Sequence, residues 1–122
     1  MTTMNVHWSA FHRDFTENEV HEYVPREGGV YLLWVRMKSR KWRCFFAGAA
    51  DNLEERLLQH LSPKEEIRCI AEQVSDYVCG FEYARVDGSR ERQGVLKFLY
   101  DRYLPDCCAE DPGGTPLKVN PP

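Results

Sequence analysis

Three segments of the chain combine aromatic and β-branched residues in the way that buried strands do. They are GVYLLWVR at 29–36, WRCFFA at 42–47 and the run at 78–86, in which Cys79, Phe81 and Tyr83 share one face. A basic turn at 37–41 separates the first two segments. The pattern therefore predicts a hairpin, followed later in the chain by a third strand.

Apolar residues recur every three to four positions in four other segments, which predicts helices. These segments are 16–24, 51–61, a stretch from 62 to beyond Val74, and one from 89 to Pro105. Each opens with a residue that can cap a helix, namely Thr16, Asp51, Ser62 and Ser89. Pro63 suits the first helical position of the third segment, and Pro105 stops the last.

The predicted order is helix, hairpin, two helices, strand, helix and tail. It indicates an α/β (α+β) fold in which a central, mainly antiparallel sheet of three strands is flanked by helices. The length suits a single domain over 1–122, with a core at about 24–105 and a helical extension at 16–24. The tail at 106–122 is rich in Pro and Gly, so we expect it to be extended on the domain or partly disordered.

The charge balance limits how the protein can hold a polyanion. Sixteen Lys and Arg against nineteen Asp and Glu give a net charge of −3. Any contact with nucleic acid therefore needs a local basic patch. The turn between the first two strands offers one: Arg36, Lys38, Arg40, Lys41 and Arg43. These charges suit phosphate binding or protection of a sheet edge equally well, and the flanking Trp34 and Trp42 favour packing in the core over stacking on bases.

The cysteines and the absence of long apolar runs bear on the compartment. The five cysteines form no C-x-x-C pair, which argues against both a zinc site and a disulfide framework. The first residues are too polar for a signal peptide, and no run is long enough to span a bilayer. We therefore expect a reduced, soluble, cytoplasmic protein that does not contact membranes.

Two polar residues stand out on the second predicted helix. Arg56 and His60 are four positions apart and so share one helix face, beside the apolar face of Leu53, Leu57 and Leu61. The guanidinium fork suits a phosphate, and a neutral imidazole exchanges protons near pH 7. The alternative is structural: a solvated arginine that pairs with a neighbouring glutamate, and a histidine favoured by the helix dipole.

The strings GVY at 29–31, FAG at 46–48 and AADNLEERLLQHL at 49–61, taken in this order and spacing, resemble the signature of the GIY-YIG nuclease family. The resemblance covers about 24–105. It implies that Tyr31 lies beside the scissile phosphate and helps to activate water, that Arg56 clamps the phosphate, and that His60 relays a proton. It also implies a divalent cation, Mg²⁺ or Mn²⁺, as cofactor and DNA as substrate.

Three positions depart from the family pattern. Phe46 lacks the hydroxyl of the second tyrosine, Leu96 stands where the family carries a metal-binding glutamate, and Cys108 replaces an asparagine. A leucine cannot hold a hard cation, because such ions require oxygen ligands. The nearest acids on the same predicted helix, Glu91 and Asp101, point roughly 140° away from Leu96. The metal ligand is therefore unidentified, unless Glu82 or Asp87 enters the site in three dimensions.

The sequence thus predicts an endonuclease-like domain that binds nucleic acid, with metal-dependent phosphodiester cleavage weak or lost. The alternative is an inactive protein-interaction or regulatory domain on the same scaffold. The nuclease interpretation depends on one geometric condition: Tyr31 and Arg56 must converge on a single surface hollow.

Overall fold

The computed structural model describes residues 3–108 and 111–122. Its central element is an antiparallel sheet of three strands in the order β3-β2-β4. The strands are β2 (Gly29–Arg36), β3 (Trp42–Ala50) and β4 (Cys79–Arg85). The predicted sheet is confirmed, and β2 coincides with its predicted segment, whereas β3 continues to Ala50 instead of ending at residue 47.

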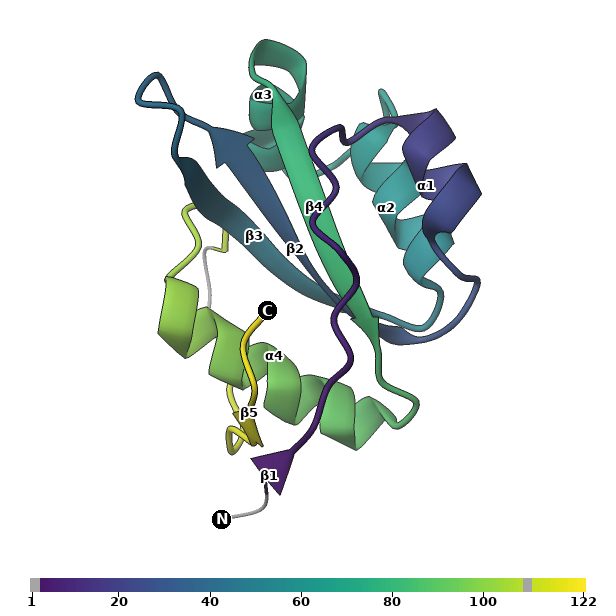
Figure 1. Ribbon diagram of the computed structural model, residues 1–122, viewed down its shortest axis with the longest axis vertical. Coiled ribbons are helices and arrows are strands. Elements are labelled where there is room, and N and C mark those ends of the chain that lie inside the picture. The colour runs from purple at the N-terminus through teal and green to yellow at the C-terminus, as the bar shows by residue number, and fades with distance from the viewer. Residues whose placement is uncertain (1–2, 109–110) are drawn as a thin grey trace.

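Helices cover both faces of this sheet (Figure 1). Within the described residues they are α1 (Glu17–Tyr23), α2 (Leu53–Leu61), α3 (Arg68–Asp76) and α4 (Ser89–Tyr103). The first three pack on one face and α4 packs on the other. Burial on both sides explains why β2 is apolar at nearly every position instead of alternating.

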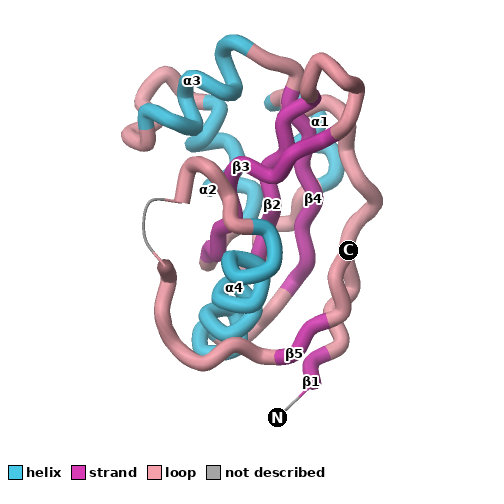
Figure 2. Tube along the Cα trace, turned by 90° about the vertical axis from the view of Figure 1, so that its left-hand side faces the viewer, coloured by secondary structure: helices cyan, strands magenta, loops and turns pink. Residues whose placement is uncertain are grey.

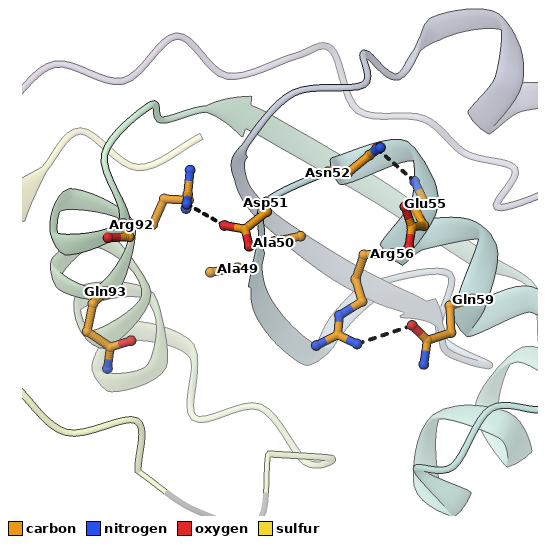
Figure 3. Close-up of a pocket in the computed structure, with 10 residues that line it drawn as sticks. Ala49, Ala50, Asp51, Asn52, Glu55, Arg56, Gln59, Arg92 and Gln93 are labelled. Carbon is orange, nitrogen blue, oxygen red and sulfur yellow. Dashed lines mark hydrogen bonds and ion pairs between the residues drawn. The ribbon is translucent and has the colours of Figure 1, made fainter.

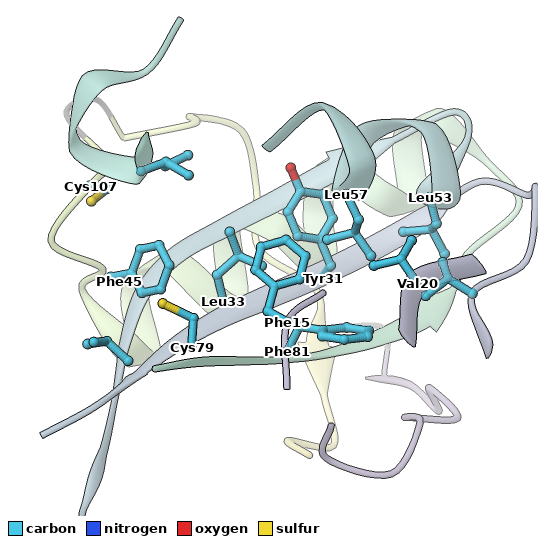
Figure 4. Close-up of a cluster of buried hydrophobic side chains, with 13 residues drawn as sticks. Phe15, Val20, Tyr31, Leu33, Phe45, Leu53, Leu57, Cys79, Phe81 and Cys107 are labelled. Atoms are coloured by element: carbon cyan, nitrogen blue, oxygen red, sulfur yellow. The ribbon is translucent and has the colours of Figure 1, made fainter. Parts of the chain in front are cut away.

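The sheet separates two hydrophobic clusters. Figure 4 shows the first, in which Tyr31 and Leu33 of β2 meet Leu53 and Leu57 of α2. The intervening residues of β2, Val30 and Leu32 among them, face α4 in the second cluster. A side chain on β2 therefore belongs to the α2 side or to the α4 side, and this division decides which residues can share a site.

The helix starts test the predicted caps. Thr16 caps α1 as predicted, since its hydroxyl accepts a hydrogen bond from the Glu19 amide at 3.2 Å. The cap of α2 is Asn52, not Asp51, and its side chain accepts from the Glu55 amide at 3.0 Å. The prediction was wrong by one residue there because the exposed Asp51 carboxylate instead binds Arg92.

The other two predicted caps are also corrected. Ser62 caps a turn, because its hydroxyl accepts from the Lys64 amide at 3.1 Å, and α3 begins only at Arg68. Residues 62–67 form a loop since Glu65 turns inward, away from a helical path. Ser89 lies within the first turn of α4, whose N-cap is Gly88.

The two ends of the chain run alongside one another and cover part of the sheet. The amides of Ser9, His12 and Phe15 donate to carbonyls of β4 at 2.8–2.9 Å, so this segment shields the outer edge of β4. Strand β1 (Thr3–Met4) pairs in parallel with β5 (Lys118–Val119), as Figure 2 shows. The tail packs on α4 through Leu117, while the predicted tail residues 109–110 lie outside the described part of the chain.

A disulfide joins Cys69 of α3 to Cys107, beyond the end of α4. The prediction of an entirely reduced chain is therefore wrong for this pair. The two cysteines are 38 residues apart and meet only because α3 and the segment after α4 both reach the β3 side of the sheet. Cys44, Cys79 and Cys108 remain as thiols.

No helix in the described ranges has the length and apolar character needed to cross a membrane. Trp34 and Trp42 are partly buried, and both pack edge-on against Phe11. Packing rather than base stacking is thus the environment of both indoles.

Candidate functional site

Tyr31 of β2 and His60 of α2 meet beneath the surface on the α2 side of the sheet. The Tyr31 hydroxyl lies 2.6 Å from Nε2 of His60, and the two residues are only 1% and 3% exposed. Gly48 pairs with Tyr31 across the strands, and a Cβ at that position would lie 2.4 Å from the phenol. The glycine of the FAG string is therefore required by the close approach of Tyr31.

Glu65 completes a hydrogen-bonded chain with this pair. Its Oε2 contacts Nδ1 of His60, and its Oε1 accepts a hydrogen bond from the Ile67 amide at 2.9 Å. The side chain is 2% exposed. Glu65 was not predicted as a site residue, because the sequence pattern places it in a helix and the structure places it in the loop before α3. The position of Glu65, five residues after His60, would have indicated a contact between them only if 62–67 had been predicted as a loop.

Arg56 lies one helical turn before His60 on α2, and its side chain is exposed. Burial raises the pKa of Tyr31, and the nearby Arg56 guanidinium opposes this by lowering it. Burial lowers the pKa of His60, whereas Glu65 raises it. Both groups are therefore neutral at pH 7. Glu65 favours the protonated form of His60, and Arg56 favours the deprotonated form of Tyr31.

The sequence predicts that Tyr31 and Arg56 share one surface hollow, and the structure meets this condition only in part. In the structure only Arg56 reaches the surface, and the phenol of Tyr31 lies beneath it. Arg56 is accordingly the exposed member of the set.

Arg56 lines a shallow cleft of about 390 Å³ between α2, the end of β3 and the start of α4 (Figure 3). The residues that define it include Ala49, Ala50, Asp51, Arg56, Gln59 and Arg92. Across the cleft from Arg56, the guanidinium of Arg92 donates to Asp51 at 2.6 Å and to the carbonyl oxygens of Val86 and Asp87. These bonds hold Arg92 in place at 11% exposure. The sequence analysis did not identify Arg92.

The three departing positions come together in a second cavity. Phe46, Leu96 and Cys108 line an apolar hollow of about 310 Å³. The ring of Phe46 packs against His60 at 5.3 Å and Tyr31 at 6.0 Å, so the hollow adjoins the buried pair. Burial raises the pKa of the Cys108 thiol, which bonds to the main chain of Ala47.

The described lining of this hollow does not fit a divalent cation. Besides the three departing residues it includes Ala47, Ile67 and Tyr100, and it offers no carboxylate. Mg²⁺ and Mn²⁺ prefer several oxygen ligands. No cluster of three or more His, Cys, Asp or Glu that suits a metal occurs in residues 3–108 and 111–122.

The alternative acids lie elsewhere. Glu82 belongs to the α4 side of the sheet, where its carboxylate accepts a hydrogen bond from the Trp34 indole at 2.9 Å. Asp87 is exposed in the loop before α4, and neither residue lines the hollow. The hypothesis that Glu82 or Asp87 enters the site as a metal ligand is therefore wrong, because neither residue lies beside Leu96 in the hollow.

The basic residues of the β2–β3 hairpin are all exposed but lie apart from Arg56. Strand pairing runs from Gly29–Ala50 near the cleft to Arg36–Trp42 at the turn, a span of about 23 Å. Arg43 forms an ion pair with Asp106 at 2.6 Å. The hairpin is thus a separate basic surface at the far end of the sheet.

No protein-family model matches the chain, and comparison with curated proteins and with solved structures found no match either.

Proposed function

We propose that this chain is a GIY-YIG-type, endonuclease-like domain that binds nucleic acid, DNA in the first instance, and whose metal-dependent cleavage is weak or lost. One arrangement carries the proposal. Tyr31 packs against the glycine of the FAG string and contacts His60, and the Arg56 guanidinium lies near enough to act on Tyr31, while the departing residues line an apolar hollow, and Phe46 among them packs on the same histidine. These contacts support phosphate binding without a site for a cation.

Binding begins at Arg56, because it is the exposed member of the set. Among residues 3–108 and 111–122, its guanidinium donates a hydrogen bond to the neutral amide of Gln59, at 3.2 Å, which a phosphate can displace. Arg92 adds a second guanidinium across the cleft, although Asp51 offsets its charge. The hairpin residues provide a further contact at the turn end of the β2–β3 ladder, which is about 23 Å long.

Cleavage is expected to be impaired for two reasons. The hollow beside His60 has no oxygen ligands for a cation that would stabilise charge in the transition state, and the Tyr31 hydroxyl is shielded from solvent. Loss of such stabilisation costs several kcal/mol, and each 1.36 kcal/mol is about tenfold in rate. We therefore expect a residual rate a few orders of magnitude below that of an intact metal site.

A second candidate function is a protein-interaction or regulatory domain. The hollow favours it, since Phe46, Leu96 and the 38% exposed Ile67 offer an apolar surface to a partner side chain. The net charge of −3 also argues against strong non-specific binding of polyanions.

Binding measurements separate the two candidates. Fluorescence anisotropy with duplex, branched and single-stranded DNA and with RNA, at low salt, should show binding that weakens steeply as salt rises. Arg56→Ala should reduce affinity about tenfold or more, because a hydrogen-bonded contact to a charged group contributes about 1.5–3 kcal/mol. The matched control is Arg68→Ala, which removes an exposed arginine from α3. Absence of affinity for all four nucleic acids would eliminate the first candidate.

Cleavage is tested with supercoiled plasmid and Mg²⁺ or Mn²⁺. The double change Leu96→Glu and Cys108→Asn is expected to raise the rate, because it returns oxygen ligands to the hollow. An Arg56→Ala version of each protein excludes contaminating nuclease. An unchanged rate in the double variant would count against the assignment of positions 96 and 108.

A further inference from the structure

The buried carboxylate of Glu65 has no role in the binding just described. We propose that Glu65 is a positioning residue for Tyr31, acting through His60. It holds the imidazole with a proton on Nδ1 and none on Nε2, so that the Tyr31 hydroxyl donates its proton to Nε2. The hydrogen-bond directions are argued from the geometry of the free protein, and only their use at a phosphate rests on the proposed function.

The positions of the hydrogens follow from the donors and acceptors in the chain. A carboxylate can only accept hydrogen bonds, so the proton between Glu65 and His60 belongs to Nδ1. A neutral imidazole carries one proton, which leaves Nε2 as an acceptor. The proton in the 2.6 Å contact must then come from Tyr31. Glu65 therefore decides the direction of both bonds.

The loop after α2 is built to hold this carboxylate. Ser62 caps a turn that brings Glu65 back under the helix, and the Ile67 amide binds the second carboxylate oxygen at 2.9 Å. Each carboxylate oxygen thus has a partner that fixes its position. Phe46 packs edge-on against the imidazole and limits its rotation.

Proton transfer along the chain is balanced without any outside reactant. The O–H bond of Tyr31 breaks, an N–H bond forms at Nε2 of His60, and the electron pair stays on the phenol oxygen. The resulting imidazolium lies between a phenolate and the carboxylate of Glu65, and Arg56 faces the phenolate. Burial alone opposes this transfer, since it disfavours both charged products. Glu65 favours the imidazolium of His60 and Arg56 favours the phenolate of Tyr31, although each opposes the charge on the other residue.

The test is heteronuclear NMR of the His60 ring in the free protein, followed as a function of pH. The wild-type protein should show Nδ1 protonated and Nε2 unprotonated at pH 7. Glu65→Gln keeps the size and an acceptor oxygen but removes the charge, so the His60 titration should move to lower pH. Glu66→Gln is the matched control, because it removes an exposed charge from the next residue and should leave the titration in place.

A wild-type His60 with its proton on Nε2, or an unchanged titration in Glu65→Gln, would overturn the proposal. If Glu65→Gln does not fold, the wild-type tautomer still decides the question, and Glu65→Asp tests whether a shortened carboxylate restores part of the effect. These measurements need no nucleic acid. If His60 has the expected tautomer and titration but the protein binds no DNA or RNA, the proposed function alone is refuted. If the protein binds nucleic acid but His60 lacks the expected tautomer or titration shift, only the role of Glu65 is refuted.

Discussion

Removing the Cys69–Cys107 disulfide should destabilise the fold by an amount that its position in the chain determines. The cross-link closes a loop over a separation of 38 residues. In the loop-entropy model this lowers the entropy of the unfolded chain by about 13 cal/mol/K, which is about 4 kcal/mol at 25 °C. For a chain of 122 residues that corresponds to a fall of about 15 °C in Tm.

The assay is urea unfolding of the oxidised protein, the reduced protein and the Cys69→Ser/Cys107→Ser double variant. The last two should agree, and both should unfold at lower urea than the oxidised form. Cys108→Ser is the control, since it removes the neighbouring thiol and leaves the cross-link intact. Thiol titration in denaturant should give three thiols before reduction and all five afterwards. The prediction is refuted if the thiol counts before and after reduction are equal. It is also refuted if removing the disulfide lowers the free energy of unfolding by less than about 1 kcal/mol, since about 2–4 kcal/mol is typical of disulfides.

Three further substitutions test the buried groups. Tyr31→Phe leaves Nε2 of His60 without a partner and should cost about 1–3 kcal/mol in urea unfolding; a neutral effect would contradict the 2.6 Å bond. Gly48→Ala places a Cβ against the phenol and should cost about 1–3 kcal/mol while shifting the Tyr31 ring resonances. Burial raises the pKa of Glu82, so the wild-type protein loses stability as the pH rises from about 4 through that raised value. Glu82→Gln keeps an acceptor for Trp34, so its advantage in Tm should be absent near pH 4 and grow toward pH 8.

The regular elements were predictable because local patterns determine them. Strand β2 carries an unbroken apolar run that leaves no other assignment, and the apolar spacing of α2 was visible in Leu53, Leu57 and Leu61. The end of β3 was less clear, because Ala49 and Ala50 suit strand and helix alike.

The loop at 62–67 was not predictable from the same kind of pattern. Ser62, Pro63 and Glu65 match a helix start closely. A contact with a residue of the preceding helix overrides that preference, because the Glu65 carboxylate gains both the imidazole of His60 and the Ile67 amide when it turns inward. The same limit applies to the disulfide and to Arg92, whose partners are distant in sequence.

The three positions that depart from the family pattern are neighbours in the structure. Positions 46, 96 and 108 were identified only by their spacing from the motifs along the chain. An error in that spacing would leave no reason for the three residues to be neighbours, yet in the structure they line one cavity beside His60. A glutamate at position 96 without a cation would be a carboxylate in an apolar lining, which is costly unless it is paired. The apolar lining therefore favours leucine at 96 together with Phe46 and Cys108, and under the proposed function the three departures are one change in the site rather than three.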